Sequence, residues 1–244
     1  DGSSWTEVGD MNTARYTAPA GFGTSTAAVA VSGATTTPGT GMPGAVESWD
    51  GSSWSEVSEK NSNVRECGSA GTSTAGIAFG GGAPPNSDSV ETWNGSSWTE
   101  VSEINTAGRC NGSKNGTTTA VIAIGRNASP HKQNESWNGT AWTEVGELVQ
   151  ERAGYGGGGG TSTSAITFGG ETSTAINAHT ETWDGTSWTD VADMAGNKMQ
   201  MGNGGASSSS AWTAGGYDGS SHIATTEIWS APATFRKLNI GDIY

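Results

Sequence analysis

The chain of 244 residues has almost no leucine, since only Leu148 and Leu238 occur against eleven tryptophans. Leucine is a leading apolar residue of helices, so its scarcity excludes helix bundles, coiled coils and α/β barrels. The longest apolar runs are five residues, at positions 27–31 and 120–124, whereas a membrane-spanning helix needs about 20. The sequence therefore predicts no transmembrane segment and no insertion into a membrane.

Positive charge and cysteine are also scarce. Eleven Lys and Arg against 24 Asp and Glu give a net charge of −13, which repels phosphate backbones and anionic lipid and so excludes nucleic acid as a partner. Cys67 and Cys110 have no histidine at a zinc-ligand spacing. They are either free buried thiols or a disulfide between neighbouring repeat units, which needs Cα atoms within about 7 Å.

A repeated pair of tryptophans organises the chain. Trp-Asp/Asn-Gly-x-x-Trp occurs at residues 49–54, 93–98, 137–142 and 183–188. A fifth copy is split, because its first half ends at Trp229 and its second half is residues 1–5. Successive copies are 44 to 49 residues apart, so five units account for nearly the whole chain.

Each unit predicts four strands. Asp-Gly or Asn-Gly between two alternating runs indicates a hairpin, with the two Trp facing each other on strands three and four. Upstream, a run such as residues 71–79 ends in a glycine pair that permits the positive φ of a tight exit, which indicates strand two. The Gly-, Ala- and Ser-rich stretch before it is strand one, which we expect nearest the axis. Ten tryptophans then pack between units, and Trp212, in strand two, is expected in the core.

The order of these features resembles the kelch repeat. The resemblance is carried by a diglycine ending strand two, an aromatic residue ending strand three, a Trp in strand four and an Arg opening the next unit. It implies an all-β fold, a five-bladed kelch-like β-propeller with four antiparallel strands per blade. The chain departs from the pattern where Trp replaces the usual Tyr of strand three, and where Ser32-Gly33 and Gly125-Arg126 replace the diglycine.

The split fifth repeat predicts how the ring closes. We expect residues 3–8 to form the outer strand of the last blade beside Trp229, joining both ends of the chain by main-chain hydrogen bonds. Residues 1–230 are then one propeller domain, and residues 231–244 are a C-terminal tail. The chain starts in mid-repeat without an initiator Met, so we expect a processed protein or a piece of a longer one.

The wording Trp-Asp/Asn-Gly-Ser-Ser-Trp-Thr-Glu-Val also resembles repeat arrays in bacteriophage structural and tail-associated proteins, and residues 236–244 are similar to segments that follow such arrays. This resemblance implies a non-catalytic, extracellular module of the virion surface that binds a host-surface glycan or protein, or other virion proteins. Two alternatives stay open. One is a secreted lectin-like propeller of a cellular organism. The other is a glycoside hydrolase, which needs paired inward carboxylates where the first strands offer only Glu66 and Glu151.

Candidate ligand-binding residues lie in the least repetitive segments, at 34–45, 82–89, 126–134, 171–180 and 217–225. A propeller places these connections on one face, and function usually lies on such loops. The candidates there are Arg126, His131, Lys132, His179, Tyr217 and His222. The three histidines stand at unequal offsets from the next strand, so we expect solvated side chains rather than a metal site. The opposite face repeats the Asp/Asn-Gly turns and suits packing against a symmetric partner.

One cation precedes each innermost strand. These residues are Arg15, Arg65, Arg109, Arg152 and Lys198. Either they form a basic ring about the axis that attracts a carboxylate or sulfate, or each pairs with a strand-four acid or a loop carbonyl. The sequence has no nucleophile elbow, phosphate-binding loop or His-Glu-x-x-His helix. It therefore predicts no catalytic residue, no metal and no cofactor.

Overall fold

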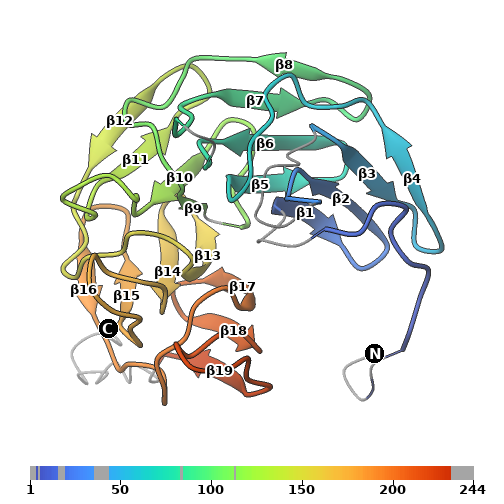
Figure 1. Ribbon diagram of the computed structural model, residues 1–244. Coiled ribbons are helices and arrows are strands. Elements are labelled where there is room, and N and C mark those ends of the chain that lie inside the picture. Colours follow the sequence, from blue (N-terminus) through green and yellow to red (C-terminus); the bar gives the residue numbers. More distant parts are fainter. Residues whose placement is uncertain are drawn as a thin grey trace, which may run out of the picture.

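The computed structural model describes residues 4, 6–15, 20–35, 44–82, 85–112 and 114–231. Within these residues nineteen strands form five antiparallel sheets, and no helix occurs. No segment of the described residues is therefore a helix able to cross a membrane. The sheets surround a common axis as the five-bladed β-propeller that the sequence predicts (Figure 1).

The innermost strands are β1 (Ala20–Thr24), β5 (Gly68–Thr72), β9 (Asn111–Gly112), β13 (Gly157–Thr161) and β17 (Gly202–Ser207). The second strands are β2 (Ala27–Val31), β6 (Ala75–Phe79), β10 (Val121–Ile124), β14 (Ser164–Phe168) and β18 (Ser210–Ala214). The third strands are β3 (Val46–Trp49), β7 (Val90–Trp93), β11 (Asn134–Trp137), β15 (Thr180–Trp183) and β19 (Thr226–Ser230). The outer strands are β4 (Trp54–Val57), β8 (Trp98–Glu100), β12 (Trp142–Val145) and β16 (Trp188–Asp190).

The paired tryptophans form the outer hairpins, as predicted. Trp49 is opposite Trp54 in the ladder, with ring centroids 5.4 Å apart. The Nε1–H of Trp49 also donates to the carbonyl of Ser25, in the turn between β1 and β2, at 3.0 Å. The same bond is made by Trp93, Trp137, Trp183 and Trp229. Tryptophan therefore ties strand three to the first turn of its blade.

The glycine pairs have the backbone that the sequence predicts. The first residue of the pair has a φ between 59° and 64° in all five blades, Ser32 included. A Cβ on Gly80 would lie 2.6 Å from the carbonyl oxygen of Gly108, which belongs to the loop entering the next blade. Glycine is needed there for both the left-handed conformation and the close approach of two blades.

The hydrophobic core lies between blades rather than within one. Four clusters each join two neighbouring blades, from blades 1 and 2 to blades 4 and 5. Within them, the Phe79 ring of blade 2 lies 5.2 Å from the Trp142 ring of blade 3. Near the axis small residues bring the innermost strands together, since a Cβ on Gly159 would lie 2.6 Å from the Cα of Gly205.

The last blade differs from the other four. In the described residues its sheet has three strands, in the order β17-β18-β19. Ser3 and Trp5 of the expected closing strand lie outside the described residues, and its described residues 4 and 6–8 are exposed and outside any strand. Of the expected C-terminal tail, only Ala231 is described. The described residues of this segment do not pair with β19, so the prediction is wrong for them. For Ser3 and Trp5 it stays a prediction.

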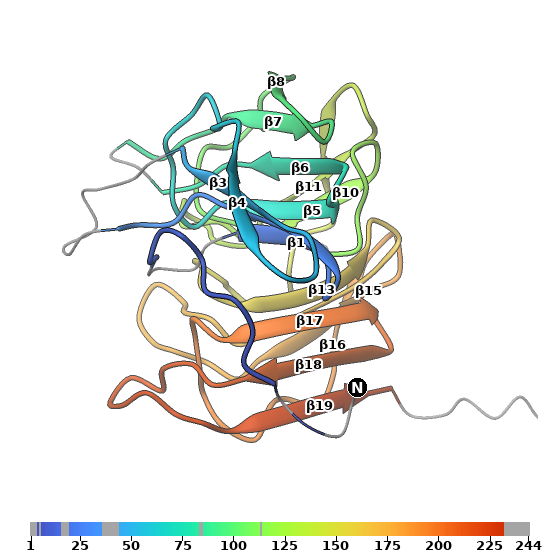
Figure 2. The ribbon, with the colours of Figure 1, turned by 90° about the vertical axis from the view of Figure 1, so that its right-hand side faces the viewer.

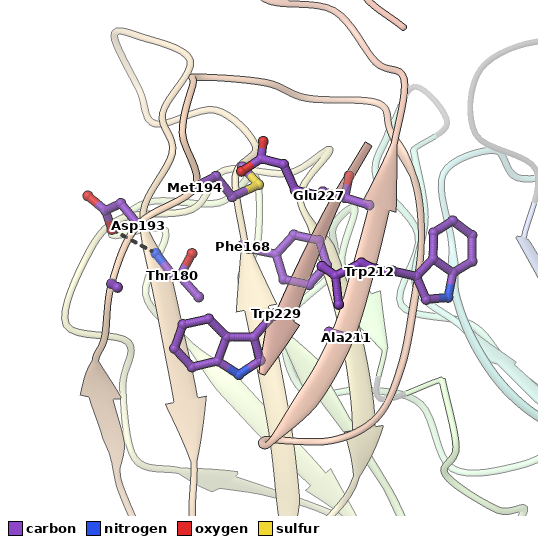
Figure 3. Close-up of a pocket in the computed structure, with 11 residues that line it drawn as sticks. Phe168, Thr180, Asp193, Met194, Ala211, Trp212, Glu227 and Trp229 are labelled. Atoms are coloured by element: carbon purple, nitrogen blue, oxygen red, sulfur yellow. Dashed lines mark hydrogen bonds between the residues drawn. The ribbon is translucent and has the colours of Figure 1, made fainter. Parts of the chain in front are cut away.

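Trp212 is not a core residue, so that prediction is wrong. Its side chain is 44% exposed, and Ile228 opposite it on β19 is 82% exposed. Figure 3 shows the Trp212 ring on the far side of β18 from Phe168 and Trp229. Both side chains are exposed because no hydrophobic cluster of the described residues joins blade 5 to blade 1.

The propeller has two unlike faces. Figure 2 shows the long connection from β18 to β19 on one side of the sheets and the tight β17–β18 turn on the other. The second-to-third-strand connections and the loops entering each blade share the first side, because antiparallel strands alternate in direction. This side carries the variable segments, and we call it the variable face.

Candidate functional site at the mouth of the axial channel

Three of the five expected axial cations point into their blades instead. Arg15, Arg152 and Lys198 have side chains no more than 1% exposed. Their charged nitrogens lie 2.8, 3.8 and 2.6 Å from the strand-three carboxylates of Glu47, Glu181 and Glu227. They do not belong to an axial ring. Their acidic partners stand in strand three, so the expected strand-four acids are wrong. The expected loop carbonyls are confirmed for two of them, since Arg15 donates to the carbonyls of Ser32 and Ala45, and Arg152 to those of Gly169 and His179.

The strand-three glutamate also binds the loop that enters its blade. Glu47 accepts the backbone N–H groups of Asn12 at 2.7 Å and Thr13 at 3.2 Å. Backbone N–H groups at the corresponding loop positions donate to Glu91, Glu135, Glu181 and Glu227. We call this arrangement the glutamate latch. It holds the incoming loop against strand three in every blade.

The pKa values of the latch glutamates depend on how well each charge is compensated. Burial acts to raise the pKa of Glu47, but hydrogen bonds from Arg15, Asn12 and Thr13 outweigh it and hold the pKa below its ordinary value. The pKa of Glu91 is lowered in the same way against its burial. Burial instead raises the pKa of Glu181, whose Arg152 partner is 3.8 Å away.

Two blades use a different cation in the latch. The Nζ of Lys60 lies 2.7 Å from Oε1 of Glu91, and Nη2 of Arg126 lies 2.5 Å from Oε1 of Glu135, all with side chains at most 1% exposed. Lys60 stands where other units have Ile104, Leu148 or Met194. Arg126 is therefore interior. The prediction that it is a ligand-binding residue of a surface loop is wrong, because its charge neutralises Glu135.

Arg65 and Arg109 stand outside this latch, and Arg109 lies at the axis. A cavity of about 660 Å³ runs along the axis and is lined by residues of all five blades, Arg109 among them. The Nε of Arg109 lies 2.6 Å from Oε2 of Glu66, and the Nε of Arg65 lies 3.9 Å from Oε1. Instead of the expected ring of five cations, the structure has two arginines close to the carboxylate of Glu66.

Three residues at the same register turn their side chains to this mouth. Glu66, Tyr155 and Gln200 each stand two residues before an innermost strand, have φ values of 57°, 55° and 54°, and line the cavity. A left-handed conformation costs a residue with a Cβ roughly 1 kcal/mol or more. Such outliers cluster at functional sites. The strain recurs in three blades while the side chain differs, which favours a role in recognition over one in the scaffold.

The groups at the mouth contact one another. The hydroxyl of Tyr155 donates to Oε1 of Glu66 at 3.2 Å, and the guanidinium carbon of Arg109 lies 5.1 Å from the Tyr155 ring centroid. Burial, and then the Glu66 carboxylate, raise the pKa of Tyr155 to about 12. Burial likewise raises the pKa of Glu171. The positive charge of Arg109 acts to lower this pKa, and the negative charge of Glu66 acts to raise it. The mouth is a partly buried, charged and asymmetric site.

An insertion in blade 3 reaches into the channel. Gly116 opens the first turn five positions after Asn111, whereas Gly71 and Gly160 follow three positions after their equivalents in blades 2 and 4. Asn115 uses this extra length to cross to other blades. Its Nδ2 donates to the carbonyl of Gly205 and its backbone N–H to that of Gly160, both at 2.9 Å.

Lys114, beside that crossing, lines the same cavity. Burial lowers the pKa of its ammonium. Among the described residues no carboxylate lies within 4.0 Å of it. In the described part of the chain, the channel therefore holds a cation with no neighbouring carboxylate to neutralise it.

The remaining candidates of the variable face are spread over blades 3, 4 and 5. Nδ1 of His131 is 3.0 Å from the carbonyl of Arg126, and Nδ1 of His179 is 3.5 Å from Oδ2 of Asp193. The His222 ring lies 5.4 Å from the ring of Tyr217, and Lys132 Nζ donates to the carbonyl of Val149 at 2.7 Å. No His, Cys, Asp or Glu group able to hold a metal occurs in the described part of the chain. A binding role for these five residues stays a prediction.

A second hollow belongs to the scaffold. It measures about 80 Å³ and lies between Phe168, Met194 and Trp229, with the Thr180 N–H donating to Asp193 at its rim (Figure 3). By the repeat, it corresponds to the position that Trp142 occupies between Phe79 and Trp137 in blade 3. Its apolar lining suits the indole of an outer-strand tryptophan.

Sequence reasoning missed Tyr155, Gln200 and Lys114, and noted Glu66 only as an inward carboxylate. The available signal is a bulky or polar residue interrupting the Gly-, Ala- and Ser-rich stretch at the start of strand one. No protein-family model matches the chain, and no curated protein matches its sequence. The propeller fold thus stands on the structure, and the kelch and phage resemblances stand on the motifs quoted above.

Proposed function

We propose that the chain is a non-catalytic module of a virion surface, of the bacteriophage tail-associated kind, that attaches the particle to a host-surface ligand through its variable face. The repeat wording supports the virion setting, because it is similar to repeat arrays of phage structural proteins. On this proposal, the protein acts outside the host cell, on the assembled particle.

The observation that carries the proposal is the convergence of non-repeated residues at one mouth of the channel. Glu66, Tyr155 and Gln200 differ at one register of the repeat and line the channel at the variable face. Glu66 there contacts Tyr155 and Arg109, a cation that has left the latch of its own blade. A scaffold needs none of them, since the glutamate latch holds each blade without them. Function usually lies where a rigid frame presents variable residues.

The engagement of Glu66 favours binding over hydrolysis. Its Oε1 accepts the Tyr155 hydroxyl and its Oε2 faces Arg109. A glycosidase of the usual kind needs two carboxyl groups flanking a scissile bond, and a carboxylate held between a cation and a phenol suits ligand positioning instead.

The test is attachment of the fluorescently labelled chain to host cells and to a glycan array. Two variants separate the faces: Lys132→Ala with His222→Ala on the variable face, and Ser52→Arg with Ser96→Arg on the repeated turns. We expect the unaltered chain to attach. The variable-face variant should attach more weakly, and the turn variant should attach as well as the unaltered chain. Absence of attachment to cells and glycans, or its loss only in the turn variant, would contradict the proposal and favour a particle-packing element.

A further inference from the structure

We propose that the mouth of the axial channel binds a carboxylate-bearing sugar residue, such as a hexuronate. This ligand class rests on the proposed function and narrows it, since it names what the variable face recognises on a host surface. The site comprises Arg109, Glu66, Tyr155 and Gln200 at the mouth and Lys114 further along the cavity.

The charge of the channel favours an anion. Arg109 and Lys114 line it and Arg65 adjoins it, while Glu66 is the one acid among the described lining residues. The protein as a whole carries a net charge of −13. The cavity therefore has more positive than negative side chains although the protein as a whole is acidic. An anionic ligand would neutralise this excess of positive charge.

The orientation of Arg109 favours a carboxylate. Its Nε faces Glu66 and its guanidinium plane lies by the Tyr155 ring. Among the described residues no acceptor is hydrogen-bonded to Nη1 or Nη2, while the backbone N–H of Arg109 is held by Asn127 at 2.8 Å. A guanidinium whose Nη groups have no such acceptor presents a planar fork that matches a carboxylate in two parallel hydrogen bonds. The neighbouring Glu66 carboxylate repels a doubly charged phosphate more than a singly charged group.

The remaining groups suit the hydroxyls of a sugar. Gln200 is exposed and its amide makes no hydrogen bond within the described residues, so two donors and one acceptor are available. Gly202, Gly204 and Gly205 of β17 also line the cavity. A volume of about 660 Å³ is in the usual range of ligand pockets. The left-handed backbone of Tyr155 and Gln200 is what turns these side chains to the mouth.

The experiment is isothermal titration of the full chain with D-galacturonate, D-galactose, acetate and sulfate. We expect galacturonate to bind about tenfold or more tightly than galactose or acetate, because each supplies only part of the recognition. Equal affinity for galactose would overturn the carboxylate contact. Equal affinity for sulfate or acetate would show that the sugar ring is not recognised, and the channel would then be only an anion site.

Variants assign the site. Arg109→Lys keeps the charge but removes the fork, and should weaken galacturonate binding about tenfold. Ser96→Arg, on a repeated turn of the opposite face, should leave the Kd unchanged. Unchanged affinity in Arg109→Lys, or an equal loss in Ser96→Arg, overturns the site. Should Arg109→Lys fail to fold, Gln200→Gly serves instead, since glycine suits its backbone, and several-fold weaker binding is expected.

The two proposals fail separately. Attachment to host cells without galacturonate binding overturns the sugar site and leaves the attachment function standing. Galacturonate binding that needs Arg109, without attachment to cells or glycans, supports the site and overturns the attachment function.

Discussion

Arg126 and Glu135 form an ion pair in which neither side chain is exposed, with Nη2 2.5 Å from Oε1. The pair neutralises the glutamate latch of blade 3 from the end of strand two, where other blades carry a second glycine. It thereby leaves Arg109, which precedes the innermost strand of that blade, to line the axial channel. A single departure from the repeat thus links the stability of one blade to the chemistry of the axis.

Arg126→Ala should destabilise the protein by about 3–5 kcal/mol, because it leaves the Glu135 charge buried and unpaired. Lys132→Ala, six residues along the same connection and exposed at its amine, should change the unfolding free energy by no more than about 0.5 kcal/mol. Denaturant unfolding of the two variants measures the difference. Similar values for both would mean that Arg126 is a surface residue after all.

The latch glutamates predict loss of stability in acid. The folded-state pKa values of Glu47, Glu91 and Glu227 lie below the ordinary 4.5. Their contribution is therefore complete above pH 4.5 and is lost as the pH falls through the lower folded values. The pKa of Glu181 is raised, so its contribution to stability depends on pH in the opposite direction. The contribution of Glu181 to the stability of the folded protein is present below pH 4.5. It is lost as the pH rises through the folded-state pKa of this residue.

Glu91→Gln and Glu181→Gln separate these two signs. At pH 7 we expect Glu91→Gln to cost at least about 1 kcal/mol more than Glu181→Gln, because the former removes a well-compensated charge and strands Lys60. The melting temperature of Glu91→Gln should also fall less between pH 6 and pH 3 than that of the unaltered protein. Equal losses at pH 7 would show that the latch does not depend on its cation.

The cysteines are free and buried, which settles the alternative between thiols and a disulfide. Burial raises the pKa of Cys67, and raises that of Cys110 to about 11. Since the thiolate is the reactive form, iodoacetamide at pH 8 should label the native protein slowly and both residues at once after denaturation. Mass spectrometry over time checks this. Rapid labelling of the native protein would place a thiol at an open surface.

The closing strand predicts a large effect of Trp5→Ala, although Trp5 lies outside the described residues. If its indole fills the hollow between Phe168, Met194 and Trp229, truncation should cost about 3–5 kcal/mol, as for other buried aromatic residues. Trp142→Ala, at the equivalent position in blade 3 and buried, is the reference. A melting temperature unchanged by Trp5→Ala, with a clear drop for Trp142→Ala, would contradict closure by residues 3–8.

The blades could be predicted from the sequence because their signals are local. The Trp-Asp/Asn-Gly turns, the glycine pairs and the alternating strands each act within about ten residues and recur five times. Charge partners could not, since Glu47 and Lys60 meet their partners across 32 and 31 residues of sequence. Arg126 is only nine residues from Glu135, but it stands where most other units carry a glycine. The recurring strand-three Glu was itself visible in the repeat. A charged residue that recurs inside a strand of every unit indicates a buried partner, and this signal was available.

The central claim is that residues departing from the repeat form a binding site at the axis. The rest of the propeller tolerates the backbone strain that these residues introduce. Tyr155→Gly tests it most directly, because glycine adopts φ 55° without strain while the ring and hydroxyl are removed. Galacturonate titration of this variant, at a melting temperature within a few degrees of the unaltered protein, should show binding weakened about tenfold or more. Unchanged affinity in the folded variant would contradict the claim.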